Sequence, residues 1–351
     1  MKILVNTPCL RLLGGVANHY LGLRQFWTED VKYNTVGRRS GKRANGNYWL
    51  PWDVVKFTFN LLTFRPNVVL LNSSLGSSAL RRDFMFSQIS RSLGFNVVIF
   101  IHGFDLDYAA QIDEGWVAKN FNKVSFIFVL AESFRETMQS WGVKTPIRLT
   151  TTKVDDALLE GYNLNQDRKF INKNILFLSR IEKAKGVYEA VDTFTLLKPK
   201  YKDLTLTFVG SGSELEALKE YAETKGLSDI RFTGRLDGEA LRNEYKNALL
   251  LLLLTTHGEG MPTVVLEAMA FGLPIFTRKV GGLVDFFENG KMGFISDSLE
   301  PKDFAEAMVS YLEDKDLTKT VSLYNAKYAK EHFMASSVAK QIENTLREYI
   351  K

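Results

Sequence analysis

The sequence is poor in the residues that build disulfide and zinc frameworks. Its 351 residues include a single cysteine, Cys9, which excludes an internal disulfide and a zinc site built from cysteines. We interpret Cys9 as a small packed residue at the end of a strand rather than as a nucleophile. A lone cysteine favours a reducing compartment, and we therefore expect a cytoplasmic protein.

Long apolar runs are equally scarce. The six leucines at 249–254 are too few to cross a membrane and fit a strand buried on both faces of a parallel sheet. The opening residues, MKILVN, are expected to form a buried first strand, because they have too little apolar length and no small-residue cleavage site for a signal peptide. The chain is longer than one core usually serves, so we expect two domains.

Negative charge is scarce in the first 100 residues. They contain 13 lysines and arginines but four aspartates and glutamates, whereas the whole chain has a net charge of +5. Aromatic side chains lie among these cations: Trp49, Trp52, Phe57, Phe59, Phe64, Phe84 and Phe86. This combination suits an anionic membrane surface; alternatively, the aromatics belong to the core and the cations to a solvated face. Nucleic acid is not an expected partner, because no recognised binding module is present.

Strand patterns alternate with helix patterns along the chain, in two successive sets. Strands are expected at 3–6, 34–36, 68–72, 97–101, 126–130 and 147–149 in the first set, and at 175–179, 205–209, 230–232, 249–254, 274–277 and 294–295 in the second. Amphipathic helices lie between them, for example at 187–197 and 213–225. This alternation predicts an α/β fold with parallel sheets and right-handed crossovers.

The most informative segment is EGMPTVVLEAMAFGLPIFTRKVGG, residues 259–282. Glu259 and Glu267 lie eight positions apart across a loop-to-helix junction, and Pro262 suits the first helical turn. Gly272 is expected to stop the helix. In a parallel sheet, ligands bind at the carboxyl ends of the strands, and both glutamates are expected there.

This segment resembles the glutamate-x7-glutamate signature of retaining nucleotide-sugar glycosyltransferases of the family-4, or group 1, type. Five further stretches resemble family motifs: Gly14-Gly15 after the first strand, His102-Gly103 after a later one, Arg180 with Lys185-Gly186 in NILFLSRIEKAKGV, Gly210 and Gly212 in LTLTFVGSGSELEAL, and Arg235 in IRFTGRL. The resemblance covers nearly the whole chain.

The resemblance implies the GT-B fold, in which two Rossmann-like parallel-sheet domains face one another across a cleft. Residues 1–165 would form the acceptor-binding domain, and residues 166–334 the domain that binds the nucleotide-sugar donor. The last helix, within residues 335–351, would cross back and pack on the first domain.

The resemblance also implies roles for single residues. Glu267 would accept hydrogen bonds from ribose hydroxyls, Glu259 would contact the donor sugar, and His102 would lie beside that sugar and the transferring oxygen. The implied catalytic set is Arg180, Lys185, Glu259 and His102. The implied donor-binding set is Gly14, Gly15, Gly210, Gly212, Arg235, Gly260, Met261, Pro262, Thr263 and Glu267.

The residue chemistry suits a reaction in which a diphosphate leaves. Arg180 and Lys185, at the carboxyl end of a strand, can stabilise charge on the departing phosphate oxygens. A helix that starts near Met261-Pro262 adds free N–H groups and the positive end of its dipole. No aspartate-x-aspartate metal motif stands out at a strand end, although residues 105–107 read DLD. We therefore expect neither a metal nor a cofactor, with the nucleotide sugar as a substrate.

The sequence thus predicts a retaining, metal-independent glycosyltransferase. It would move a sugar from a UDP- or GDP-sugar to a glycan or lipid-linked acceptor in bacterial surface polysaccharide synthesis, in the cytoplasm or peripherally on the inner leaflet of the plasma membrane. Two alternatives stay open: a nucleotide-sugar epimerase or hydrolase of the same fold, and a non-catalytic nucleotide-sugar-binding subunit. Residues 149–156, LTTTKVDD, depart from the proline-asparagine-glycine stretch of many family members, so the donor's identity does not follow from the resemblance.

Overall fold

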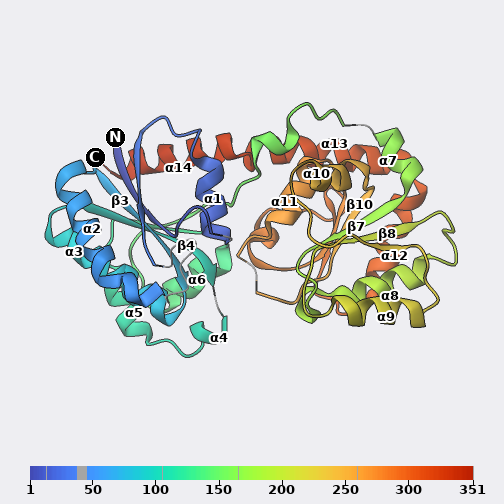
Figure 1. Ribbon diagram of the computed structural model, residues 1–351, viewed down its shortest axis with the longest axis horizontal. Helices are drawn as coiled ribbons and strands as arrows, with labels where there is room; N and C mark the ends of the chain where they lie inside the picture. The colour runs from blue at the N-terminus through green and yellow to red at the C-terminus, as the bar shows by residue number, and fades with distance from the viewer. Residues whose placement is uncertain (13, 38–45, 105, 165, 259, 351) are drawn as a thin grey trace. The chain divides into compact units, whose positions relative to one another are not determined.

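The computed structural model describes residues 1–12, 14–37, 46–104, 106–164, 166–258 and 260–350, which form two compact units (Figure 1). The first unit contains Met1–Lys153, Gly258–Met261 and the chain from Ala335 onward. The second contains Val154–His257 and Pro262–Met334. Each unit is a parallel sheet flanked by helices.

The first unit has a six-stranded parallel sheet in the order β2-β1-β3-β4-β5-β6. Its strands are β1 (Lys2–Thr7), β2 (Asp30–Thr35), β3 (Val68–Leu75), β4 (Asn96–Phe104), β5 (Phe126–Val129) and β6 (Ile147–Leu149). Its helices are α1 (Gly15–Leu23), η1 (Gly46–Trp49), α2 (Leu50–Phe64), α3 (Ser77–Ser92), α4 (Leu106–Ala109), α5 (Glu114–Phe121), α6 (Glu132–Ser140) and α14 (Ala335–Tyr349). Residues 68–71 are fully buried, as expected for a parallel strand whose two faces are both covered.

The second unit has a six-stranded parallel sheet in the order β12-β11-β10-β7-β8-β9. Its strands are β7 (Asn174–Leu178), β8 (Thr205–Val209), β9 (Ile230–Phe232), β10 (Leu250–Leu253), β11 (Ile275–Arg278) and β12 (Gly293–Ser296). Its helices are η2 (Asp156–Leu159), α7 (Gln166–Asn172), η3 (Lys183–Lys185), α8 (Val187–Leu197), α9 (Leu215–Thr224), α10 (Gly238–Asn247), α11 (Thr263–Ala270), η4 (Gly281–Asp285), α12 (Pro301–Glu313) and α13 (Lys315–His332).

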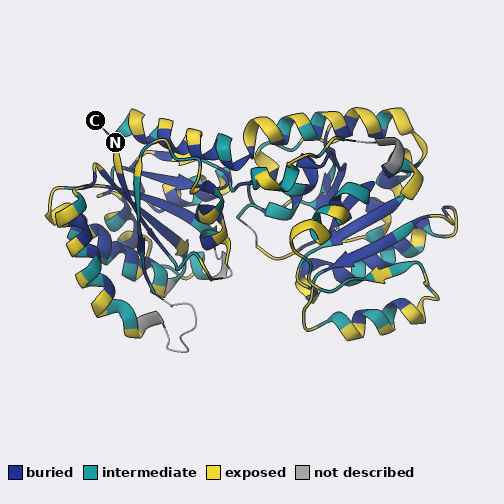
Figure 2. Cartoon of the chain, turned by 45° about the horizontal axis from the view of Figure 1, so that its top comes forward, coloured by how far each residue is buried: buried dark blue, intermediate teal, exposed yellow. Residues whose placement is uncertain are grey.

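The predicted α/β architecture with two parallel sheets is confirmed. Each of the twelve predicted strand positions overlaps an observed strand, and the helices predicted at 187–197 and 213–225 correspond to α8 and α9. The leucine run forms β10, whose four residues are all buried. Figure 2 shows the buried strands inside each unit and the exposed outer faces of the helices. Among the described residues, no helix is both long and apolar enough to span a membrane.

The last helix, α14, packs on the first unit, as the fold prediction requires. Its apolar side, which includes Val338, Ile342 and Leu346, is buried in the core of that unit. These positions recur at intervals of four, which places them on one face of the helix. Residues of α14 therefore form part of the same hydrophobic core as residues of β1.

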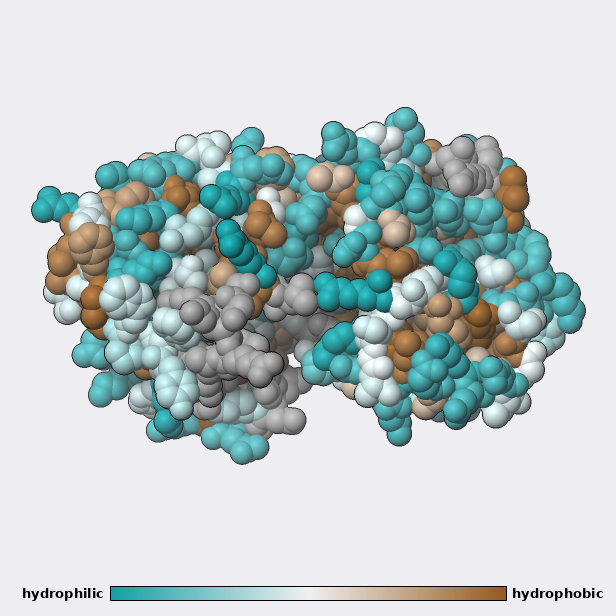
Figure 3. Space-filling view, in the orientation of Figure 1, coloured by the Kyte–Doolittle hydropathy of each residue, from teal (hydrophilic) through white to brown (hydrophobic). Residues whose placement is uncertain are grey.

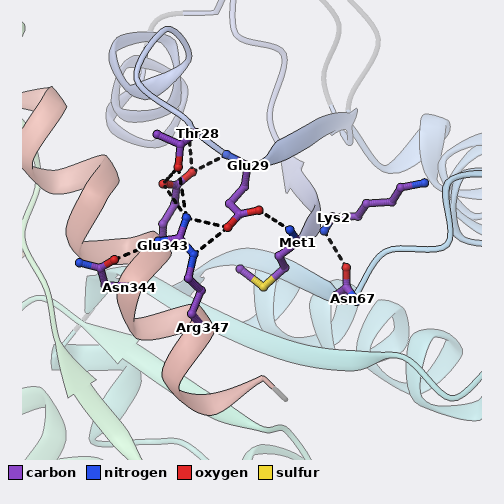
Figure 4. Close-up of polar contacts among 8 residues, drawn as sticks. All are labelled: Met1, Lys2, Thr28, Glu29, Asn67, Glu343, Asn344 and Arg347. Carbon is purple, nitrogen blue, oxygen red and sulfur yellow. Dashed lines mark hydrogen bonds and ion pairs between the residues drawn. The ribbon is translucent and has the colours of Figure 1, made fainter.

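A polar network fixes the orientation of α14 (Figure 4). Glu343 is buried, and its carboxylate accepts hydrogen bonds from the N–H groups of Thr28 (2.7 Å) and Glu29 (2.9 Å) and from the Thr28 hydroxyl (2.6 Å). Arg347 donates to Glu29 at 2.7 Å, and Glu29 also pairs with the N-terminal ammonium of Met1. Burying a carboxylate is costly unless its oxygens accept hydrogen bonds. Because these donors are available to Glu343 in one position of α14, the network specifies how that helix packs on the first unit.

The contacts divide the chain after Lys153, earlier than the predicted boundary between residues 165 and 166. The reason lies at Val154, which forms a β-bridge with Met334 and donates its N–H to the Phe333 carbonyl at 2.7 Å. The segment from Val154 onward therefore packs with the second unit. The polar stretch at residues 162–173, which spans the predicted boundary, lies within that unit.

Candidate active site

In the second unit, the strand order reverses direction beside β7. The chain first proceeds outward from β7 through β8 to β9, and it then returns to place β10 on the other side of β7. Ligands of doubly wound folds bind outside the carboxyl ends of the strands at such a switch point. The loop after β7 contains Arg180, and Lys185 lies in η3 beyond it. The loop after β10 and helix α11 contain Gly260, Met261, Pro262, Thr263 and Glu267.

Backbone contacts hold these two loops together. The N–H groups of Thr256 and His257 donate to the Ala184 carbonyl at 2.9 and 3.2 Å. Gly186 has a φ of +76°, and a Cβ there would lie 2.3 Å from the Leu254 carbonyl oxygen. Only glycine fits such a position. The lysine-glycine pair is therefore fixed against the end of β10.

Arg180 and Lys185 differ in exposure. Arg180, just after β7, is 62% exposed and donates a 2.6 Å hydrogen bond to Glu182. An ion pair so exposed adds little stability, which leaves the guanidinium able to bind an anionic ligand. Lys185, in η3, is 6% exposed. Its ammonium is largely shielded from water, where charge interactions are stronger than at the surface.

Two glycines after β8 are required by packing. A Cβ on Gly210 would lie 1.8 Å from the Ser179 carbonyl oxygen, and one on Gly212 would lie 2.2 Å from that of Ile181. The turn after β8 therefore presses directly on the segment that contains Arg180. This packing accounts for both glycines, and their contact with a donor stays a prediction.

Glu267 lies on α11 and is held by a buried tyrosine. Its Oε2 accepts a 2.7 Å hydrogen bond from the Tyr245 hydroxyl, whose ring stacks on Phe271 with centroids 5.0 Å apart. Burial and the adjacent carboxylate raise the pKa of Tyr245 well above its ordinary value, so its hydroxyl remains a donor. Pro262 is the N-cap of α11, one position before the helical turn predicted for it.

A buried lysine connects the C-terminal ends of α10 and α11. Lys169 is 1% exposed, and its Nζ donates to the carbonyl oxygens of Tyr245 and Phe271, each at 3.0 Å. Burial lowers the pKa of Lys169 to about 7. Since helix C-termini have partial negative charge, the lysine joins the ends of α10 and α11 and steadies the residues that position Glu267.

The segment Gly258–Met261 belongs to the first unit by its contacts. A Cβ on Gly260 would lie 2.7 Å from the His102 carbonyl oxygen and 3.0 Å from Leu130. Met261 packs against the core of the same unit. Glu259 lies outside the described residues. The structure thus brings Gly260 and Met261 to the carboxyl end of β4.

The first unit has its own switch point, where β1 lies between β2 and β3. Gly14 and Gly15 stand there at the beginning of α1. A Cβ on either glycine would meet nothing within 4 Å. The fold leaves room for a side chain at both positions, so their small size favours the close approach of a ligand rather than a packing requirement.

His102 lies inside β4, at its carboxyl end, rather than just after the predicted strand. Its Nε2 lies 2.8 Å from Asn72 Oδ1, which also accepts the Tyr20 hydroxyl at 2.6 Å, while Asn72 Nδ2 donates to the Asn6 carbonyl. Since that Asn72 oxygen is an acceptor, Nε2 carries the hydrogen and Nδ1 has a free lone pair. Burial, then the neighbouring His19, lowers the pKa of His102 well below its ordinary value, so the ring is neutral at pH 7.

Comparison with known proteins identifies part of the chain. Residues 164–329 match the family described as "Glycosyl transferases group 1". The second unit contains a group 1 glycosyltransferase domain. The matched residues include Arg180, Lys185 and Glu267, whereas Gly14, Gly15 and His102 lie outside them. The resemblance seen in the sequence is confirmed over this domain.

Curated relatives match about half to two thirds of the chain. The sequence is 24% identical over 230 residues to the capsular polysaccharide biosynthesis glycosyltransferase CapM of Staphylococcus aureus, covering 63% of this chain and 58% of CapM. It is 30% identical over 179 residues to a D-inositol 3-phosphate glycosyltransferase of Corynebacterium jeikeium, covering 48% of this chain and 42% of that protein. The chain spans about half the length of the curated relatives it matches.

Solved structures resemble the whole chain. Anabaena HepE has a TM-score of 0.74 at 18% identity, with 99% of this chain and 100% of HepE covered. A glycosyltransferase of Rickettsia africae has a TM-score of 0.77 at 13% identity, with 100% and 98% covered. These similarities confirm the GT-B fold beyond the limits of the group 1 domain.

One candidate residue of the first unit was missed by sequence reasoning. His19, on α1, is 2% exposed, and neither ring nitrogen has a hydrogen-bond partner among the described residues. Its ring lies edge-on to that of His102 at 5.2 Å between centroids. Burial, with a smaller effect of Lys153, lowers the pKa of His19 to about 3. The available signal was its place four residues after Gly15, on the same face of the helix one turn later.

One predicted residue follows the next strand but one from β7. Arg235 is exposed in the loop after β9, and it forms no hydrogen bond or ion pair within the described part of the chain. Its neighbour Gly234 accepts the Gly210 N–H at 2.9 Å, and a part for Arg235 in donor binding stays a prediction. In the same described part, no group of three or more His, Cys, Asp or Glu residues could hold a metal ion; Asp105 lies outside it.

Proposed function

We propose that this chain is a retaining glycosyltransferase that moves a sugar from a nucleotide sugar to a glycan or lipid-linked acceptor. The main support is the set of groups at the switch point of the group 1 domain: exposed Arg180, buried Lys185 and Glu267. Two cations suit a diphosphate, and a carboxylate suits the ribose hydroxyls. All three follow neighbouring strands of one sheet.

The cations would act on the leaving group. As the bond between sugar and diphosphate breaks, negative charge accumulates on the phosphate oxygens. Arg180 offers a planar fork for two of them, and Lys185 offers a point charge that is shielded from solvent. The positive end of the α11 helix dipole, at Thr263, adds a third positive region. Charges fixed before the reaction stabilise its transition state without further rearrangement.

The donor would be held through its ribose and its sugar. Glu267, fixed by Tyr245, would accept the ribose hydroxyls. His102 is neutral, and its Nδ1 lone pair can accept a hydroxyl of the transferring sugar. Anabaena HepE was solved with UDP and glucose, and pneumococcal GtfA with UDP and GlcNAc. These complexes favour UDP-sugars as the first donors to test, ahead of GDP-sugars.

Acceptor, stereochemistry and cofactor use complete the proposal. We assign the acceptor to the first unit, and the name of the relative CapM favours a surface polysaccharide as the product. Retention of configuration follows the family resemblance. The cations at the switch point can take over the task of a metal ion, so transfer should need none. The basic first 100 residues favour a position on the inner leaflet of the plasma membrane.

Thermal unfolding in the presence of a panel of nucleotide sugars tests whether the chain binds a donor. A ligand at 100 times its Kd stabilises the folded state by about 2.7 kcal/mol, which raises Tm by several degrees. We expect a UDP- or GDP-sugar to raise Tm and to release its nucleoside diphosphate once an acceptor is added. Stabilisation with an altered sugar and no transfer would indicate an epimerase or hydrolase, and no stabilisation by any nucleotide sugar would contradict the proposal.

A further inference from the structure

Helix α2 and the turn before it expose a continuous apolar stripe. Tyr48, Trp52, Val55, Phe59 and Leu62 are each between 56% and 81% exposed. Their spacing alternates between four and three residues, which places them along one side of a helix. In the space-filling view, hydrophobic atoms gather over the outer end of the first unit, where Figure 1 shows α2 (Figure 3). We call these five residues the α2 stripe.

The opposite side of α2 is already buried. Phe57 and Leu61 belong to the core of the first unit. A helix that is apolar on both sides is normally covered on both sides, and no described residue covers the α2 stripe. Of the seven aromatics noted in the sequence, Phe57, Phe84 and Phe86 are core residues, whereas Trp52 and Phe59 belong to the stripe.

Cations flank α2, both beside Phe64 at its C-terminal end and on the adjacent helix α3. The Nζ atoms of Lys2 and Lys32 lie 5.3 and 5.6 Å from the centre of the Phe64 ring, at the end of α2. Arg65 follows and is exposed, and Arg81 is exposed on the adjacent helix α3. Aromatic and aliphatic side chains beside lysine and arginine are the composition of an interfacial membrane helix.

The carboxylates of this region are withdrawn from the surface. Residues 31–104 contain ten lysines and arginines and two acidic residues, Asp53 and Asp83. Asp53 is 1% exposed and accepts the Gly37 N–H at 2.6 Å. Asp83 is 1% exposed and pairs with Arg82 at 2.9 Å. This stretch therefore adds cations and apolar side chains, but no exposed carboxylate, to the described surface around α2; the exposed Asp30, one residue before it, lies opposite Lys2 in the sheet.

We propose that the α2 stripe docks on an anionic membrane surface. The five apolar side chains would enter the boundary between headgroups and acyl chains, and the cations would meet lipid phosphates. A second copy of the chain fits less well, because a two-fold contact through this face would bring like charges together. This inference rests on the proposed function and extends it. It identifies the surface that would bring the enzyme to a lipid-linked acceptor.

Vesicle flotation tests the docking surface directly. We expect the wild type to bind vesicles that contain phosphatidylglycerol, to bind phosphatidylcholine vesicles less, and to lose binding as salt rises. The double variant Trp52→Ser/Phe59→Ser should bind at least about tenfold less. Leu196→Ser/Leu323→Ser is the matched control, because both leucines are 53% exposed on the second unit, outside the stripe. It should bind as the wild type does.

Two results would overturn the inference. One is equal vesicle binding by the wild type and the Trp52→Ser/Phe59→Ser variant. The other is a dimer in solution that only this variant loses, which would make the α2 stripe a subunit interface. Stabilisation by nucleotide sugars, measured on the same samples, should be unchanged in all variants. If that stabilisation is absent while vesicle binding persists, the glycosyltransferase proposal fails and the docking surface stands.

Discussion

Single side chains at the switch point of the group 1 domain differ in how firmly the fold holds them. Arg180 is exposed and pairs with Glu182, whereas Lys185 is buried next to Gly186, which packs against the end of β10. Glu267 is fixed by Tyr245, which is itself stacked and buried. The buried groups are thus oriented in advance of ligand binding, and Arg180 retains freedom to follow a departing phosphate.

Replacing either cation should slow the reaction rather than unfold the protein. Arg180→Ala and Lys185→Ala should each lower kcat by about 10²–10³, because each removes one charge that stabilises the transition state. Arg231→Ala is a matched control for Arg180: it is an exposed arginine of the same unit, paired to Glu244. Steady-state kinetics with saturating donor measures the effect. Wild-type turnover in both variants would show that Arg180 and Lys185 do not take part in the reaction.

Tyr245→Phe should mainly raise the donor KM. The change removes the hydroxyl that orients Glu267, and contacts to the ribose act about equally before and during the reaction. Tyr162→Phe is the control, because the Tyr162 hydroxyl bonds to the Phe271 carbonyl at 3.0 Å and not to Glu267. A larger KM in the control than in Tyr245→Phe would show that packing, not the carboxylate contact, matters here.

The buried histidine on α1 should make stability depend on pH. The unfolded chain protonates His19 below a pKa of about 6.5, but the folded chain protonates it only near a pKa of about 3. Between these values the unfolded state binds more protons, so the free energy of unfolding falls as pH drops from 6.5 toward 3. Between pH 7 and 5 this loss is about 2 kcal/mol for one such group.

His19→Leu tests this dependence. The leucine cannot titrate, and it leaves no partner behind, since both ring nitrogens lack partners within the described residues. Urea unfolding at pH 7 and pH 5 should show a smaller loss of stability for the variant than for the wild type. Equal losses would mean that His19 is protonated in the folded protein, contrary to its burial.

The sequence predicted which candidate residues follow the end of a strand, but it did not predict which residues pair across the fold. Arg180, Lys185 and Glu267 follow apolar runs, and the runs fix where they lie. Tyr245 and Glu267 are 22 positions apart on different helices, so no local pattern links them. His19 resembled any buried residue of a helix, so no local pattern distinguished it.

At the scale of elements, loops and glycines decide how the site is assembled. The loop after β10 leaves the second unit's contacts at Gly258 and returns to them at Pro262. Gly260 lets this loop pass against the His102 carbonyl. Strands were predictable because each is a short apolar run buried in a parallel sheet. The path of this loop was not, because its contacts are with residues more than a hundred positions away.

Gly260→Ala should displace the loop after β10 and lower activity. Its Cβ would lie 2.7 Å from a backbone oxygen, so the loop or β4 must move, and small misplacements in an active site cost large factors in rate. Gly258→Ala is the matched control, because its Cβ would meet nothing within 4 Å. We expect at least about a tenfold lower kcat/KM for Gly260→Ala and little change for the control. Equal kcat/KM values for the two variants would show that the close contact of Gly260 with the His102 carbonyl does not matter for activity.

At the scale of the whole molecule, two parallel sheets and a returning helix reproduce the GT-B fold. The periodicity of the sequence predicted both sheets, and family resemblance predicted the return of α14. The boundary after Lys153 was not predictable, because it depends on the pairing of Val154 with Met334 at the far end of the second unit. The hydrogen bonds of the buried Glu343, which hold α14, were not predictable either, because Glu343 pairs with Thr28 and Glu29 at the other end of the sequence.

The most direct test of the central claim is sugar transfer followed by NMR of the product. Purified protein is incubated with a UDP- or GDP-sugar and an acceptor extract in excess EDTA, alongside Arg180→Ala. We expect nucleoside diphosphate release that requires acceptor, persists without metal and falls by about 10²–10³ in the variant. The anomeric proton of the new bond should keep the configuration of the donor. Release that is independent of Arg180, abolition by EDTA, or an inverted product would contradict a retaining glycosyltransferase that relies on these cations.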